Sequence, residues 1–262
     1  MCLVALAWKP GRNLHLLLAA NRDEFHARPS LPLATWSDAP DVLGGRDQSA
    51  MGTWLGVSTR GRLAVVTNVR TPAPPEPTPR SRGALAADFL RGSASPVANH
   101  LRIQPTLPEY SPCNLLMADA REACYLSNQA GIAPRILEPG LYGLSNAALD
   151  TPWPKLVTLK AAVRRWLHRG GSLAGVEPLF EALARTDQPM DALLPNTGVG
   201  LERERRLAPV FIRGTDYGTR CSTLLWVTED GEGCITERRF GPDGVGLGET
   251  QRRFRWPLTA QH

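Results

Sequence analysis

The chain has 262 residues, of which 42% are hydrophobic, so it can form a sizeable core and wholesale disorder is excluded. The net charge at pH 7 is +5, and lysine stands at only three positions among the 30 basic residues. The basic residues form no long blocks and do not alternate with aromatics, so nucleic-acid binding is not expected. The arginine bias is compatible with anionic partners, although a coding bias with solvated arginines explains it more simply.

Five cysteines and five histidines are scattered along the chain, without C-x-x-C or H-x-x-x-H spacing. We therefore expect no metal site, no disulfide framework and a reducing compartment. The first apolar stretch has no basic leader and is broken by KPGR at 9–12. It is also too short to cross a bilayer, so we expect no signal peptide, no membrane span and a cytoplasmic protein.

The chain begins with two apolar runs, CLVALAW at 2–8 and LHLLLAA at 14–20. A Pro-Gly turn separates them, which predicts a β-hairpin. Both runs are almost continuously apolar, as is typical of strands that are covered on both faces. His15 is expected in the core. The second strand is expected to end at four polar residues, Asn-Arg-Asp-Glu at 21–24.

The middle of the chain continues with hairpins and then changes to helices. Residues 26–50 are rich in Pro, Asp, Ser and Gly and predict a loop. The segment TPAPPEPTP at 71–79 predicts a second surface loop, because proline excludes regular structure there. The remaining patterns predict hairpins over 53–69 and 113–128, a strand over 140–147, and helices over 82–92, 151–171 and 175–185.

The last part of the chain returns to strands. Three apolar runs predict strands at 208–214, 220–230 and 234–240, and the last two pair around DGEG. The glycine-rich GVGLGE at 244–249 does not lie between a strand and a helix, so it is read as a flexible turn and not as a phosphate-binding loop. Hairpins, two helices and more hairpins indicate an antiparallel α+β fold in a single domain over 1–262.

Cys2 directly follows the initiator methionine. Methionine aminopeptidases remove Met1 before a small residue, which would leave a thiol and a free α-amine on one residue. Their ordinary pKa values, about 8.5 and 8, allow the amine to act as the base of the thiol near neutral pH. Taken alone, however, Cys2 fits a small buried residue at the start of a strand better than a nucleophile.

The predicted hairpin brings residues 21–23 next to Cys2. Arg22 would there lower the pKa of the thiol. Asp23 would accept hydrogen bonds from the N-terminal ammonium and hold it in place. A solvated, charged strand end is the simpler alternative.

Three further segments place polar residues at strand ends. Asn68 and Arg70 end one strand, Asn146 ends another, and Tyr217 and Arg220 stand at the head of a late strand. Asparagine amides in such positions can donate to a developing oxyanion, although asparagine is also common in turns. Arg220 would need an anionic or hydrogen-bonding partner if it is buried, and a salt bridge at the rim is the alternative.

Together these motifs resemble the NRDE family, which is the family of the transport and Golgi organisation protein 2. The resemblance covers residues 2 to about 240 and rests on Cys2, NRDE at 21–24, TNVR at 67–70, YGLSNA at 142–147 and YGTRCST at 217–223. The family is similar to N-terminal-nucleophile hydrolases of the choloylglycine hydrolase and penicillin V acylase group. The resemblance therefore implies a four-layer αββα sandwich of antiparallel sheets.

The resemblance also implies a catalytic set. Mature Cys2 would attack a linear C–N amide, with Arg22 and Asp23 assisting, although the acylases space these two residues differently. Asn68 and Asn146 would stabilise the oxyanion, and Arg220 would complete the site. We expect substrate contacts from four residues near these motifs: Asn21, Glu24, Arg70 and Tyr217.

A second function stays open at this point. The family has been linked to haem trafficking and to lipid or acyl-CoA metabolism. The alternative to catalysis is thus a protein that binds haem or another small amphipathic ligand in the same cavity. No cofactor is required for the hydrolase, and haem is possible as a ligand. The sequence does not indicate the substrate or the oligomeric state.

Overall fold

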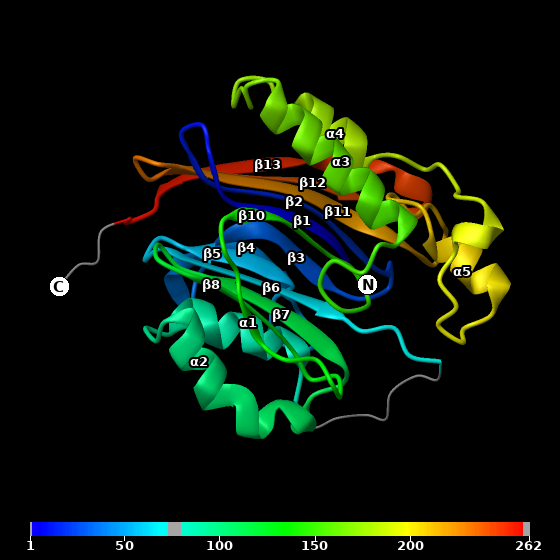
Figure 1. Cartoon of the computed structure of the whole chain (residues 1–262), viewed down its shortest axis with the longest axis horizontal. Helices are drawn as coiled ribbons and strands as arrows, with labels where there is room; N and C mark the ends of the chain where they lie inside the picture. Colours follow the sequence, from blue (N-terminus) through cyan, green and yellow to red (C-terminus); the bar gives the residue numbers. More distant parts are fainter. Residues whose placement is uncertain (1, 73–79, 259–262) are drawn as a thin grey trace.

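The computed structural model describes residues 2–72 and 80–258. Two antiparallel sheets pack face to face, and helices cover the outer face of each sheet (Figure 1). The predicted four-layer αββα sandwich is therefore confirmed. Strands from the beginning and the end of the chain share one sheet, so the two ends of the sequence are built into the same layer.

The first sheet has six strands, and the long β1–β2 hairpin lies within it. The apolar residues of β1 alternate between two cores: Val4, Leu6 and Trp8 face the second sheet, whereas Leu3, Ala5 and Ala7 face helices. This double covering explains why the run is continuously apolar. In spatial order the strands are β10 (Gly140–Leu144), β1 (Cys2–Gly11), β2 (Leu14–Phe25), β11 (Tyr217–Thr228), β12 (Glu232–Phe240) and β13 (Gly246–Arg255).

The second sheet has seven strands in sequence order, so each strand pairs with the next one along the chain. They are β3 (Ser30–Trp36), β4 (Ala39–Asp47), β5 (Leu55–Ser58), β6 (Arg62–Asn68), β7 (Cys113–Ala118), β8 (Ala123–Ser127) and β9 (Arg135–Ile136). The inner faces of the two sheets enclose the central apolar core.

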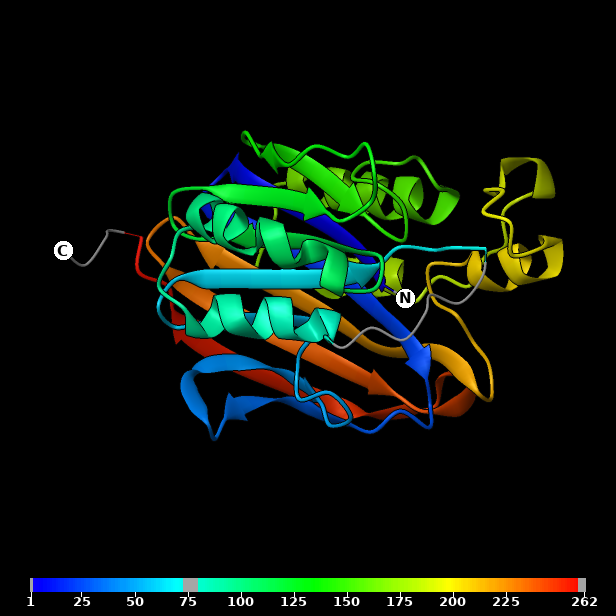
Figure 2. The ribbon, with the colours of Figure 1, turned by 90° about the horizontal axis from the view of Figure 1, so that it is seen from below.

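Helices α3 (Pro154–His168) and α4 (Glu177–Leu183) cover the first sheet, and α1 (Arg82–Arg91) and α2 (Pro96–Ile103) cover the second. Helix α5 (Leu201–Leu207) lies beyond the end of the sheets in both views (Figure 2). Short 3-10 helices lie at Gln104–Glu109, Asp191–Leu193 and Pro242–Gly244. Within the described residues, no helix has the length and apolarity that a bilayer crossing requires.

Most predicted hairpins and helices are confirmed, but four local predictions are wrong. Residues 26–50 contain the β3–β4 hairpin: β3 is an edge strand with exposed residues, and Pro, Asp and Gly interrupt the apolar pattern of β4. Strand β2 continues through the NRDE residues to Phe25. Residues 246–255 form the exposed edge strand β13, and the 208–214 segment is irregular although largely buried. The sequence also gave no indication of α2 or α5, and most of the predicted 71–79 loop lies outside the described residues.

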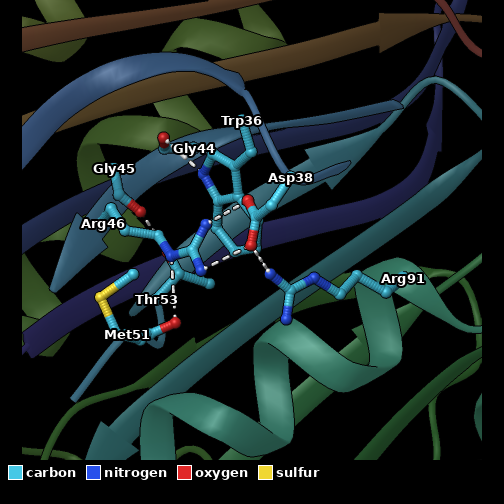
Figure 3. A network of polar contacts seen from close by, with 8 residues as sticks. All are labelled: Trp36, Asp38, Gly44, Gly45, Arg46, Met51, Thr53 and Arg91. Atoms are coloured by element: carbon cyan, nitrogen blue, oxygen red, sulfur yellow. Dashed lines mark hydrogen bonds and ion pairs between the residues drawn. The ribbon is translucent and has the colours of Figure 1, made fainter. Parts of the chain in front are cut away.

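A network of polar contacts fixes the β3–β4 hairpin to α1 (Figure 3). Arg46 donates two hydrogen bonds to the carboxylate of Asp38, at 2.7 and 3.0 Å, and Arg91 of α1 donates to the same carboxylate. Both guanidinium groups lie over the ring of Trp36. Arg46 also donates to the carbonyl of Met51, next to a segment that contributes Thr53 to the cavity described below.

We expect this network to stabilise the fold in a pH-dependent way. Hydrogen bonds from Arg46 lower the pKa of Asp38 to about 2. Because an unfolded aspartate has a pKa of about 3.9, the stabilisation is complete above that pH and is lost as the pH falls towards 2. The urea midpoint of Asp38→Asn should therefore lie below that of the wild type at pH 6, and the difference should vanish near pH 2.

Asp41→Asn is the matched control, because Asp41 is exposed and its ion pair with Arg60 is longer, at 3.5 Å. It should change the midpoint less than Asp38→Asn at pH 6. A difference between Asp38→Asn and the wild type that stays constant down to pH 2 would contradict the role assigned to the carboxylate.

Candidate functional site

The register of the β1–β2 hairpin places Cys2 directly opposite Arg22. Arg22 in turn lies opposite Cys221 of β11, and Cys221 lies opposite Arg239 of β12. These four residues form one row across the first sheet, and paired residues of antiparallel strands point to the same face. The predicted proximity of Cys2 to the NRDE residues is therefore confirmed.

The alternation of side chains along β2 divides the NRDE residues between two faces. Arg22 faces the second sheet, where its guanidinium stacks on Trp54 at 4.1 Å from the ring centroid. Asn21 points to the helical side: its amide donates to the carbonyls of Leu183 and Val210, both at 2.8 Å, and it accepts from Ser222. With 1% of its surface exposed, Asn21 ties the sheet to the covering segments, and its predicted substrate contact finds no support in this geometry.

Asp23 is buried at the head of the sheet, with 1% of its surface exposed. Its Oδ1 accepts a hydrogen bond of 2.7 Å from the hydroxyl of Thr219. Asp23 also borders the cavity that contains Cys2. A buried carboxylate next to the N-terminal residue fits the predicted role of holding an amine in place.

A buried lysine of α3, which the sequence did not indicate as a site residue, lies close enough to Asp23 to interact with its charge. Lys155 of α3 is 4% exposed, and its ammonium donates to the carbonyl of Leu207 at 3.1 Å. Burial lowers the pKa of Lys155 to about 8, and the charge of Asp23 opposes this shift. The helical spacing could have predicted its burial. Lys155 stands four residues before Leu159, so both side chains lie on the apolar face of the helix.

Cys2 lies in a cavity of about 100 Å³ at one end of the two sheets. Two further arginines that sequence reasoning missed border it: Arg28, which pairs with Asp47 at 2.6 Å, and Arg82, which donates to the carbonyl of Pro112. The cavity is strongly polar, with charged groups of both signs. Its lining includes Cys2, Arg22, Asp23, Glu24, Arg28, Asp47, Thr53, Trp54, Asn68, Ser81 and Arg82.

Burial raises the pKa of the Cys2 thiol above its ordinary value. The negative charges of Asp23 and Glu24 raise this pKa further, whereas the positive charge of Arg22 lowers it. The expectation that Arg22 would produce a low thiol pKa is therefore only partly met, because desolvation outweighs the arginine. A nucleophilic Cys2 needs a base that removes its proton in place.

A larger cleft of about 680 Å³ adjoins this cavity, and Glu24 and Asn68 border both. Arg70 and Tyr217 line the cleft, and their contact with a substrate stays a prediction. Arg70 is held by a buried ion pair with Glu204 of α5 and lies over the ring of Trp153 at 4.6 Å. The cleft combines apolar groups with arginines and carboxylates. Its lining includes Phe25, Val69, Leu207 and Tyr217, the arginines Arg70, Arg203 and Arg206, and the acidic residues Glu24, Glu202 and Asp216.

The two predicted oxyanion residues lie side by side at the ends of β6 and β10. The amide of Asn146 donates to the carbonyl of Asn68 at 2.9 Å, and the N–H of Arg70 donates to the carbonyl of Asn146 at 2.8 Å. Ser145 donates to the carbonyl of Cys2 at 3.1 Å. Asn68 borders the Cys2 cavity. Asn146 is 1% exposed, does not line the cavity and holds the backbone of Asn68 through this hydrogen bond.

Arg220 is not brought to the same cavity. It is the extra residue of a β-bulge, because Thr219 pairs with Asp23 and Cys221 pairs with Arg22. Its Nη1 donates to the carbonyls of Phe25 and Arg28, at 2.8 and 3.1 Å, and its side chain lines a separate pocket. The bulge turns this residue away from Cys2, which a sequence pattern cannot show.

The cavities offer no evident metal or haem ligand set. Over residues 2–72 and 80–258, no three side chains of His, Cys, Asp or Glu gather closely enough to hold a metal ion. Neither the cavity of Cys2 nor the adjoining cleft has a histidine in its lining. A haem in the cleft would have to be held by arginine–propionate pairs and apolar contacts instead of an imidazole.

Residues 1–242 match the family model described as Transport and Golgi organisation 2. The chain belongs to this family. It is 34% identical to the bovine Transport and Golgi organization protein 2 homolog, over 97% of this chain and 99% of that protein. The human homolog is also 34% identical, over 96% and 97% of the two chains, and the Drosophila melanogaster protein is 27% identical over 88% of each.

Two solved structures are distantly similar to this family member. The Caenorhabditis elegans N-acylethanolamine-hydrolyzing acid amidase ortholog is 11% identical, with a TM-score of 0.49 over 86% of this chain and 92% of that one. A variant of the conjugated bile acid hydrolase from Clostridium perfringens is 9% identical, with a TM-score of 0.48 over 99% of each chain. At these values the likeness carries no conclusion about activity.

We expect Lys155 to cost the fold stability at neutral pH. Its folded-state pKa of about 8 lies below the ordinary value of 10.5, so a desolvated ammonium is present at pH 7. The unfolded chain binds more protons between pH 8 and about 10.4, and stability therefore rises with pH in that window. Lys155→Met should be about 2 kcal/mol more stable at pH 7, after allowing for the lost hydrogen bond, with a smaller gain at pH 10.

Urea unfolding at the two pH values measures this difference. Lys160→Met is the control, since Lys160 lies on the same helix but is partly exposed and paired with Asp150. The control should not be more stable than the wild type. If Lys155→Met is less stable than the wild type at pH 7, the prediction is wrong, because the buried ammonium then stabilises the fold.

Proposed function

We propose that the chain is an N-terminal-nucleophile amidohydrolase that cleaves a linear C–N amide with Cys2 as nucleophile. One observation carries the proposal: Cys2 lies in a polar cavity with Asp23 and Asn68, and this cavity shares Glu24 and Asn68 with a cleft large enough for a substrate. A structural cysteine at a strand start would need neither the buried carboxylate nor the adjoining cleft.

Removal of Met1 would give Cys2 a free amine, which supplies the missing base. The amine takes the proton of the thiol as the sulfur attacks the amide carbon, and the resulting ammonium protonates the leaving nitrogen. Water then hydrolyses the thioester and releases the acid. Asp23 would hold the amine, and Arg22 would favour the thiolate against the desolvation that raises the pKa of Cys2.

The Asn68 and Asn146 pair supports the stabilisation of the tetrahedral intermediate. Asn68 borders the cavity, and the hydrogen bond from Asn146 fixes the backbone of Asn68 at that position. Donors that are held in place before the reaction stabilise a developing oxyanion without reorganisation. In this proposal Asn68 donates to the oxyanion, and Asn146 is a positioning residue.

The composition of the cleft supports an amphipathic substrate. Phe25 and Tyr217 form an edge-to-face pair at 5.1 Å, and Arg203 and Arg206 stand on the α5 side. The aromatic pair suits an apolar segment of the substrate, whereas the arginines suit an anionic or strongly polar one. Burial raises the pKa of Tyr217 well above its ordinary value, so its phenol stays a hydrogen-bond donor at neutral pH.

The first requirement is a processed N-terminus. Intact-mass analysis of the purified protein should show that Met1 is absent. The processed protein should hydrolyse members of a panel of N-acyl amides with a chromogenic leaving amine, because the α-amine of Cys2 is then available as base. Cys2→Ala should abolish this hydrolysis and acylation at residue 2.

Cys124→Ala serves as the control, because Cys124 is a buried thiol on β8 outside both cavities. It should keep the activity. Protein that fully retains Met1 and still turns over the same amides would exclude the mechanism, as would unchanged activity of Cys2→Ala.

A second function is supported by the same cleft: binding of haem or another small amphipathic ligand without catalysis. The supporting observation is that Arg203 and Arg206 border a cleft that also carries apolar groups, among them Phe25 and Val69. Guanidinium groups pair well with propionate-type carboxylates. This function requires neither the removal of Met1 nor the thiol of Cys2.

Titration with haem separates this function from hydrolysis. Binding should give a saturable shift of the Soret band that Cys2→Ala leaves unchanged. Arg206→Gln should weaken binding about ten-fold, since one charge-assisted hydrogen bond is lost. Arg185→Gln is the matched control, because Arg185 pairs with Asp187 and neither residue lines the cleft. The absence of a shift at micromolar protein would exclude haem as the ligand.

A further inference from the structure

A third pocket lies on the other side of Arg22 from Cys2. It has a volume of about 140 Å³ between β2, β11, β12 and the start of β3. Its charged lining residues are Arg22, Arg220, Arg239 and Glu237. Arg22 and Trp54 border both this pocket and the Cys2 cavity, so the stacked guanidinium and indole form a shared wall.

The three arginines keep unused donors. Arg220 uses Nη1 for the carbonyls of Phe25 and Arg28, and Arg239 uses Nη2 for the carbonyl of Leu247. The Nε of Arg239 is buried and has no hydrogen-bond partner in the part of the chain that the structure describes. A buried donor without an acceptor costs free energy, which an incoming oxygen would recover.

The single carboxylate of Glu237 offsets only one of the three positive charges that line this pocket. One of its oxygens already accepts the N–H of Leu33 at 2.8 Å, and its surface is 3% exposed. Burial raises the pKa of Glu237, and the positive charges of Arg239 and Arg22 oppose this shift. The nearby charge of Arg22 lowers the pKa of Arg220 in addition to burial, so two of the arginines repel each other across the pocket.

We propose that this pocket binds an oxyanion, a phosphate or carboxylate group held between Arg22, Arg239 and Arg220. Guanidinium forks match the geometry of such groups, and the anion would supply the acceptor that Arg239 lacks. Two exposed leucines at the rim, Leu31 and Leu247, allow the anionic group to carry a short apolar tail. The site does not rest on hydrolysis at Cys2.

The shared Arg22 couples this site to the nucleophile. An anion in the pocket takes up part of the charge of Arg22, which then stabilises a thiolate at Cys2 less. Binding of an anion in this pocket therefore lowers the reactivity of the Cys2 thiol. Alkylation of Cys2 by iodoacetamide, followed on the N-terminal peptide by mass spectrometry, should slow as phosphate is added at constant ionic strength.

Calorimetric titration with inorganic phosphate at constant ionic strength tests the site. The wild type should bind phosphate in a saturable way, and Arg239→Gln should bind it at least about ten-fold more weakly. Arg252→Gln is the matched control, because Arg252 has the same charge on the exposed edge strand β13 outside the pocket. It should bind as the wild type does, and phosphate should slow Cys2 alkylation in it but not in Arg239→Gln.

A second pair of probes identifies the source of the anionic group. Hexanoate that binds more tightly than phosphate supports a carboxylate with an apolar tail, whereas binding of phosphate alone supports a free oxyanion. Absence of binding of both anions to the wild type, equal binding to Arg239→Gln, or equal binding of neutral hexanamide and hexanoate overturns the proposal. If Arg239→Gln does not fold, Arg239→Lys, which keeps the charge but loses the fork, should still bind more weakly.

Discussion

The register of β1 against β2 is the constraint on which the rest of the site depends. Cys2 lies opposite Arg22, so the residues before and after Arg22 point to the other face of the sheet. A shift of one residue would exchange the two faces: Arg22 would enter the helical core, and Asn21 and Asp23 would enter the space between the sheets. The continuous burial of both strands on both faces excludes such a shift.

This register produces a polar region at one end of an otherwise apolar sandwich. Between the sheets it places Cys2, Arg22, Cys221 and Arg239 in one row, and on the helical side it places Asp23 near Lys155 of α3. Buried charges of this kind are costly, and a core of the same shape could be apolar. Their presence at one end of the sheets, next to two cavities and a cleft, is the physical argument for a binding or catalytic site.

Arg22 is the element that joins the two sides of this region. It stacks on Trp54 and borders both the Cys2 cavity and the pocket of Arg220 and Arg239. The β-bulge at Arg220 separates these compartments, because it turns that arginine to the far side of Arg22. A residue that the sequence motif assigns to the nucleophile thus belongs by position to a neighbouring pocket.

The sequence by itself determined the antiparallel α+β class, the central hairpins and the proximity of Cys2 to Arg22, because apolar periodicity and a Pro-Gly turn are local signals. It missed β3 and β13, since exposed edge strands lack an apolar run, and it missed β4, since Pro, Asp and Gly interrupt the apolar pattern of that strand. Tertiary structure alone decided the burial that raises the pKa of Cys2, the place of Lys155 behind Asp23, and the turn of Arg220 away from the nucleophile. These features depend on desolvation and on pairing between segments some 130 to 200 residues apart, which no local pattern contains.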